Sequence, residues 1–135
     1  MTASDAMQSG IISVSPELPL DELEELLAGE EISGAPVTNS AGKVLGVVSK
    51  TDIIRFLSEQ VAGAFDGSLM AGSCVRDIMT DGAVGVAPDT ELRAVAEVML
   101  DEKIHRVLVT EKHEVLGILT TFDVIRGLLA ESAER

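Results

Sequence analysis

One sequence motif occurs twice in this chain, and each copy ends in a Gly-x-x-(Ser/Thr)-x-x-Asp signature, Gly46 to Asp52 and Gly117 to Asp123. Matching residues stand at an almost constant offset through both halves. They include the pairs Pro16 and Pro88, Val37-Thr38 and Val109-Thr110, and Ile54-Arg55 and Ile125-Arg126. A duplicated motif predicts two similar structural units, so the repeat constrains the fold more than any other feature.

Both copies predict the element order β-α-β-β-α. A short apolar run precedes a segment with apolar residues at helical spacing, and two apolar runs joined by a polar turn follow. A closing helix begins within the signature. The predicted strands lie at residues 11–14, 35–38 and 44–49 in the first copy, and at 84–86, 107–110 and 115–119 in the second.

The repeat divides the chain into a first motif at residues 1–62, a connecting segment at 63–72 and a second motif at 73–135. Each motif has roughly 60 residues, too few to bury its sheet easily alone. We therefore predict an α/β (α+β) domain in which the two motifs pack sheet to sheet around a pseudo-twofold axis. The Ala- and Gly-rich stretch at residues 60–72 is expected to be partly helical and to pack against a neighbour.

The amino-acid composition narrows the range of functions that the chain could have. Hydrophobic residues make up 46% of the chain and aromatic residues 2%, which predicts an aliphatic core and no base-stacking platform. The net charge of −13 disfavours nucleic acid and anionic membranes as partners. One cysteine, Cys74, allows no internal disulfide, and its role stays open. With no apolar leader or membrane-length run, we expect a soluble, cytoplasmic protein without a metal site.

The signature has two interpretations. Ser/Thr followed three residues later by Asp resembles a capping box, which satisfies free N–H groups at a helix start. The same carboxylate could instead accept hydrogen bonds from ribose hydroxyls, beside the positive end of the helix dipole. Both uses are compatible because Asp has two oxygens. The signature glycine either permits close packing of the backbone or lets a ligand approach the strand.

The ordered set of motifs, present twice, resembles the CBS domain family, named for cystathionine β-synthase. The resemblance rests on the segments Asp77-Ile78-Met79-Thr80, Val86-Ala87-Pro88-Asp89-Thr90, Ile104 to Val109 and Gly117 to Ile125. It covers nearly the whole chain. A tandem CBS pair of this kind implies an adenine nucleotide or S-adenosylmethionine-type ligand, with no required cofactor. It also implies a homodimer and a regulated partner protein.

Carried over by position, the resemblance assigns ribose hydroxyls to Asp52 and Asp123. It assigns sugar or phosphate oxygens to Ser49, Thr51 and Thr120. The base pocket would be lined by Ile12, Val14, Ala35 and Pro36 in one motif, and by Val84, Val86, Val107 and Leu108 in the other.

The two copies differ in ways that affect a ligand. His105-Arg106 would neutralise phosphate, whereas the first copy has Ser33-Gly34 there and is compensated in part by Lys50. The family pattern often has Pro where Leu108 stands, and Pro36 keeps it, so the second pocket differs in shape. A strongly acidic chain repels polyanions, so we expect monophosphates or adenosyl thioethers to be favoured over ATP.

The leading functional hypothesis is a non-catalytic sensory module whose ligand changes how a partner protein is engaged. The alternative is a dimerising interaction protein with empty clefts, in which the signatures are caps only. An enzyme is disfavoured because no phosphate-binding glycine loop and no nucleophile–base pair is visible in the sequence.

Overall fold

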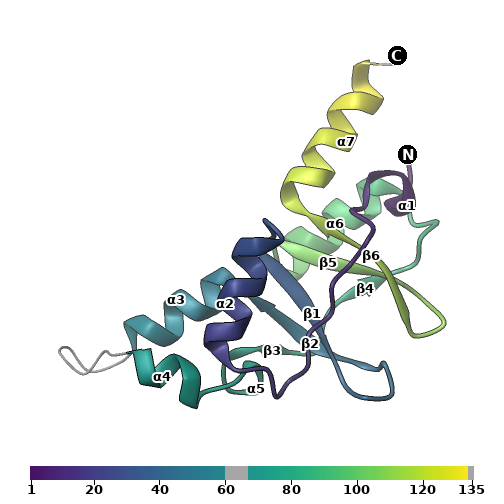
Figure 1. Cartoon of the computed structure of the whole chain (residues 1–135). Coiled ribbons are helices and arrows are strands. Elements are labelled where there is room, and N and C mark those ends of the chain that lie inside the picture. Colours follow the sequence, from purple (N-terminus) through teal and green to yellow (C-terminus); the bar gives the residue numbers. More distant parts are fainter. Residues whose placement is uncertain (60–66, 134–135) are drawn as a thin grey trace. The chain divides into compact units, whose positions relative to one another are not determined.

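The computed structural model describes residues 1–59 and 67–133, and the chain divides into two compact units (Figure 1). The first-repeat unit comprises Ile12–Ala83. The second-repeat unit combines Met1–Ile11 with Val84–Arg135. Each unit contains a three-stranded sheet and helices, so the predicted α+β class is confirmed. The packing of the two motifs around a pseudo-twofold axis stays a prediction.

The first-repeat unit contains an antiparallel sheet in the order β1-β2-β3. Its elements are α2 (Leu20–Gly29), β1 (Gly34–Thr38), β2 (Val44–Ser49), α3 (Lys50–Ser58), α4 (Gly67–Gly72), α5 (Val75–Ile78) and β3 (Thr80–Asp81). The strand predicted at residues 11–14 is reduced to one residue: only Val14 pairs, in a single parallel bridge with Val37. Strand β3 was not expected from the sequence.

The second-repeat unit shows the complete predicted order β-α-β-β-α. Its elements are α1 (Ala3–Ala6), β4 (Gly85–Val86), α6 (Leu92–Glu102), β5 (Arg106–Glu111), β6 (Glu114–Thr120) and α7 (Thr121–Ala133). Strand β4 pairs parallel to β5, and β5 pairs antiparallel to β6. Gln8 bridges to Ile118 on the far side of β6, at the repeat position that β3 occupies against β2.

The first residues of each repeat, 1–11 and 73–83, are called its leading segment. Residues 1–11 pack in the second-repeat unit, and residues 73–83 pack in the first-repeat unit. Ala3, fully buried, joins the core around Leu92 and Val95, and Figure 1 shows α1 beside α6 and α7. Val75, also fully buried, joins the core around Leu20. The predicted divisions at residues 62 and 73 follow the sequence repeat, whereas the compact units change over at residues 11–12 and 83–84.

Equivalent hydrogen bonds hold the two leading segments. The Ala3 N–H donates to the Thr90 carbonyl at 2.8 Å, and the Val75 N–H donates to the Leu18 carbonyl at 2.9 Å. Each segment ends in a glycine with positive φ, 72° at Gly10 and 70° at Gly82. Side chains other than glycine rarely adopt this conformation, so glycine suits the turn just before the chain enters the other unit.

The cores are aliphatic, as predicted. Helices α2 and α6 bury leucine, valine or methionine at helical spacing: Leu20, Leu23 and Leu27 in one, and Leu92, Val95 and Met99 in the other. Helix α4 confirms that the connecting stretch is partly helical, and Met70 packs against the first-repeat core. The remainder of that prediction, residues 60–66, lies outside the described residues. No helix in the described part of the chain is long and apolar enough to cross a membrane.

Candidate functional site

The signature lies at the same strand-to-helix junction in each unit. Strand β2 passes directly into α3, and β6 passes directly into α7. The two signature carboxylates are the buried charged groups of the described core, with Asp52 6% exposed and Asp123 5% exposed. A buried carboxylate is costly unless donors surround it, so the neighbours of these groups determine what the site can bind.

Both carboxylates act as helix caps through one oxygen. The Oδ2 atom of Asp52 accepts from the Ser49 N–H at 2.8 Å and from the Ser49 hydroxyl at 3.1 Å. The Oδ2 atom of Asp123 accepts from the Thr120 N–H at 2.8 Å and from the Thr120 hydroxyl at 3.0 Å. The capping interpretation is therefore correct. It leaves the Oδ1 atom outside the cap in both units.

The Oδ1 atoms meet different partners that sequence reasoning missed. In the first-repeat unit Arg55 donates to Oδ1 of Asp52 at 3.1 Å. In the second-repeat unit the Gln8 side-chain amide donates to Oδ1 of Asp123 at 3.2 Å and to Oδ2 at 2.9 Å. Arg55 follows Asp52 by three positions on one helix, a spacing that predicts contact. Nothing local in the sequence predicts Gln8.

The signature glycines allow the leading segments to cross the sheet closely. A Cβ atom on Gly46 would lie 2.1 Å from the Thr80 carbonyl oxygen. A Cβ atom on Gly117 would lie 2.2 Å from the Met7 sulfur. Both distances are far inside van der Waals contact. Of the two explanations offered for these glycines, close packing of the chain's own segments is the one that the structure supports.

The start of each closing helix is hydrogen-bonded to the residue just before β1 or β5. The Lys50 N–H donates to the Ser33 carbonyl at 2.9 Å, and the Thr121 N–H donates to the His105 carbonyl at 3.1 Å. His105 is thereby brought to the signature of its own unit, with Arg106 next to it at the start of β5. Lys50 and Thr51 are exposed in the first turn of α3.

The predicted base-pocket residues are joined by backbone hydrogen bonds, and their side chains are buried or half-buried. The Val14 N–H donates to the Pro36 carbonyl at 2.9 Å, and the Leu108 N–H donates to the Val84 carbonyl at 3.0 Å. Five of these side chains are in or against the cores: Val14, Ala35, Val84, Val86 and Val107. Pro36 and Leu108 are buried, while Ile12 and Val84 are half-buried. The ligand roles of all these residues stay predictions.

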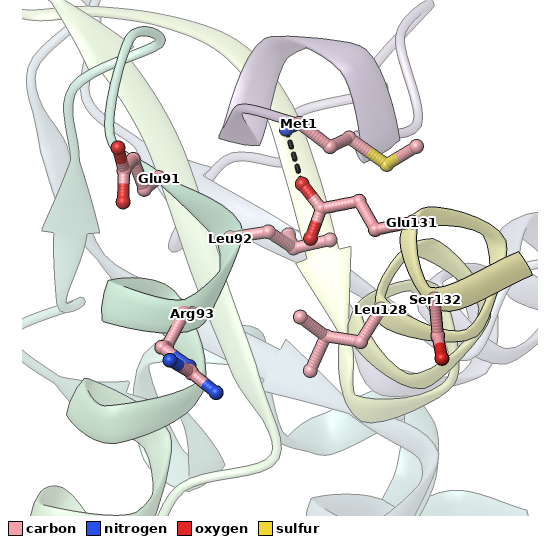
Figure 2. Close-up of a pocket in the computed structure, with 7 residues that line it drawn as sticks. All are labelled: Met1, Glu91, Leu92, Arg93, Leu128, Glu131 and Ser132. Atoms are coloured by element: carbon pink, nitrogen blue, oxygen red, sulfur yellow. Dashed lines mark hydrogen bonds and ion pairs between the residues drawn. The ribbon is translucent and has the colours of Figure 1, made fainter. Parts of the chain in front are cut away.

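A separate hollow of about 500 Å³ lies in the second-repeat unit, between the start of α6 and the end of α7 (Figure 2). Its polar lining includes Glu91, Arg93 and Glu131. The Met1 amino group donates to Glu131, and this hydrogen bond raises the pKa of the amino group. None of the predicted ligand residues lines this hollow. In the described part of the chain no three His, Cys, Asp or Glu residues form a potential metal site.

Comparison with known proteins agrees with the fold. The model of the CBS domain family matches twice, at residues 3–59 and 75–130, so the chain belongs to the CBS domain family. The matched ranges cover both signatures, most of both leading segments and every strand of the described structure. The family thus accounts for the repeat.

Similar proteins include a kinase subunit and two solved CBS structures. The gamma-3 subunit of 5'-AMP-activated protein kinase of Homo sapiens is 27% identical over 110 residues, which is 81% of this chain and 22% of the subunit. The crystal structure of CBSX2 in complex with AMP has a TM-score of 0.78 and 28% identity, and covers 97% of this chain and 98% of that one. CBSX2 is a CBS-pair protein of Arabidopsis thaliana.

A second solved structure is the CBS domain pair of protein MJ0100 with 5'-methylthioadenosine and S-adenosyl-L-methionine. It has a TM-score of 0.82 and 21% identity, covering 97% of this chain and 98% of that one. That likeness concerns the fold. The chain spans 24% or less of the length of the first curated relatives that it matches, so their whole-protein activities are not assigned to it.

Proposed function

We propose that this chain is a non-catalytic regulatory module that binds an adenosyl ligand of the AMP or S-adenosylmethionine class and thereby modulates a partner protein. One observation carries the proposal. Each unit holds a buried carboxylate at a helix start, and its Oδ1 atom lies outside the cap, where a ribose hydroxyl can donate to it. The AMP complex of CBSX2, a relative in fold and sequence, supports the ligand class.

The charge of the chain favours ligands with few phosphates. With a net charge of −13, each added phosphate increases the repulsion that an approaching ligand must overcome. Lys50 and Arg55 are cations near the Asp52 signature, and Arg106 is a cation near the Asp123 signature. We therefore expect AMP and S-adenosylmethionine to bind more tightly than ATP. Calorimetry that finds ATP much tighter than both would contradict this expectation.

Thermal unfolding with a ligand panel tests the proposal. A ligand that binds the native state at 100 times its Kd adds about 2.7 kcal/mol to the free energy of unfolding, which raises Tm by several degrees. AMP or S-adenosylmethionine should produce this shift. Asp123→Ala should abolish the part of the shift that comes from the second-repeat unit, because the ribose loses its acceptor.

A matched control separates lost binding from a lost cap. Asp5 accepts from the Thr2 N–H at 2.8 Å in the short helix α1, so Asp5→Ala removes a cap of the same kind without touching a signature. Each Asp→Ala change should lower the free energy of unfolding by about 1 kcal/mol. Only Asp123→Ala should also reduce the ligand shift. Equal ligand shifts in both variants would rule out a ribose at Asp123.

The second candidate function is a ligand-free interaction module that dimerises, and an exposed apolar face favours it. Helix α7 displays Phe122, Ile125 and Leu129 at helical spacing, exposed by 74%, 55% and 66%. Such an apolar stripe on the exposed face of a helix is typical of a protein–protein contact. A homodimer is compatible with both functions, so we propose it for this chain with α7 at the interface.

Light scattering combined with size exclusion tests the dimer. Ile125→Asp places a charge in the middle of the stripe, and desolvating that charge should weaken a dimer at least 100-fold, giving a monomer at micromolar concentration. Ser132→Asp on the same helix, also exposed, serves as the charge-matched control and should remain dimeric. A monomeric unaltered chain, or an Ile125→Asp variant that stays dimeric, would refute this interface.

A further inference from the structure

The carboxylate of Asp123 is engaged by a residue from the far end of the chain. The Gln8 amide donates to both of its oxygens, whereas Gln8 itself is fixed by two backbone hydrogen bonds with Ile118, at 2.9 and 3.0 Å. Its neighbour Met7 lies against Gly117, where no side chain intervenes. The hydrogen bonds of Gln8 with β6 therefore hold its side chain beside Asp123.

The acceptor capacity of Asp123 is nearly used up. A carboxylate offers about four lone-pair positions, two on each oxygen. Oδ2 already receives the Thr120 N–H, the Thr120 hydroxyl and the Gln8 amide, and Oδ1 receives the Gln8 amide again. A ribose diol needs two acceptor positions. Since the Thr120 bonds belong to the helix cap, the Gln8 amide is the donor that a diol would have to replace.

The carboxylate of Asp52 presents a smaller obstacle. Its Oδ1 atom accepts from Arg55, whose side chain is 58% exposed and belongs to the same helix. Asp52 itself is buried, but the guanidinium of Arg55 is largely exposed and can turn into solvent, so a ligand can replace it without displacing a residue from another segment. The repeat counterpart of Gln8 is Thr80, a shorter side chain on β3 that is exposed. The two sites thus differ in the side chain that already donates to Oδ1, which is Arg55 at Asp52 and Gln8 at Asp123.

We propose that Gln8 is a specificity-determining residue of the Asp123 site: its amide competes with the ribose diol, so that a ligand binds there only by displacing the leading segment's side chain. This rests on the proposed adenosyl-binding function. The consequence is an intrinsic inequality between the sites, in which the Asp52 site binds a given ribose ligand more tightly. Binding at Asp123 in turn releases a contact between residues 1–11 and α7.

Calorimetry with AMP tests the competition in an Asp52→Ala variant, in which the measured binding comes from the Asp123 site alone. Gln8→Thr introduces the residue of the other repeat and removes the competing amide. We expect it to tighten AMP binding about tenfold, which corresponds to about 1.4 kcal/mol, close to the lower end of the usual strength of a hydrogen bond to a charged group. For 2'-deoxy-AMP, which has one hydroxyl in place of the diol, the gain should be at most threefold. Ser9→Ala, at the exposed neighbouring position, should change neither affinity.

The outcomes are distinct. Unchanged or weaker AMP binding in Gln8→Thr overturns the competition while leaving the proposed function intact. A chain that binds neither AMP nor S-adenosylmethionine, in the unaltered form, overturns both. A second measurement needs no variant: the Gln8 side-chain NH₂ resonances of the unaltered protein should shift on AMP titration as the amide leaves Asp123. Unshifted resonances at saturating AMP would overturn the proposal as well.

Discussion

Replacing Gly46 with alanine should lower the free energy of unfolding of the first-repeat unit by about 3 kcal/mol, at the upper end of the usual cost of overpacking. The new Cβ would lie 2.1 Å from the Thr80 carbonyl oxygen and 3.1 Å from its carbon. These are backbone atoms of β3, so no side-chain rotation can relieve the overlap. Strands β2 and β3 would therefore have to move apart.

Urea denaturation of Gly46→Ala measures this loss, with Gly29→Ala as the control. Gly29 has no heavy atom within 4 Å of its would-be Cβ and no positive φ, so alanine there should change stability by less than about 1 kcal/mol. Gly117 offers a further contrast because its obstacle is the side chain of Met7. Met7→Ala should rescue part of the damage of Gly117→Ala, whereas no side-chain change should rescue Gly46→Ala. Equal stability of Gly46→Ala and Gly29→Ala would show that β3 does not cross at Gly46.

Ala3→Asp should unfold the second-repeat unit even though the substitution lies at the other end of the chain. Ala3 is fully buried in the core that also contains Leu92 and Val95. Burying a carboxylate there, without a partner, costs several kcal/mol, which is most of the stability of a small unit. The loss should exceed that of any surface change by a wide margin.

Hydrogen exchange locates the damage. Ser4→Asp is the control, because it adds the same charge one residue further on at an exposed position and should be nearly neutral. In Ala3→Asp, fast exchange should appear in β5, β6 and α6, while β1, β2 and α2 keep most of their protection. Fast exchange confined to β1, β2 and α2 would mean that α1 packs with its own repeat instead.

Much of this fold could be predicted from the sequence because its signals are local. The spacing of Leu20, Leu23 and Leu27 indicated a helix, and the apolar runs before each signature indicated β2 and β6. Duplication made each signal appear twice, which made them far more secure than one copy would be. The short strand at residues 11–14 was overestimated, because a few apolar residues indicate burial and do not show how far pairing extends.

The exchange of leading segments could not be predicted, for a physical reason. Residues 1–11 and 73–83 are repeat counterparts with similar apolar patterns, so each would suit either core by composition alone. The amino-acid pattern therefore does not decide which core each segment joins. The same limit applies to the site. The Arg55 contact was missed although its helix spacing with Asp52 predicts it, whereas Gln8 lies 115 positions from Asp123 and reaches it only through the exchange.

The exchange also sets an order of events during synthesis, since chains emerge from the ribosome N-terminus first. The first-repeat unit is contiguous, and it can close once Ala83 has emerged. Residues 1–11 gain their partners only when α6, β5, β6 and α7 have emerged, so this segment is placed after the first-repeat unit that follows it in the sequence. Until then Ala3, Ala6 and Met7 remain without the apolar surface that covers them in the finished protein. A nascent chain halted when Ala83 has just cleared the ribosome should therefore carry a folded first-repeat unit and an open N-terminal segment.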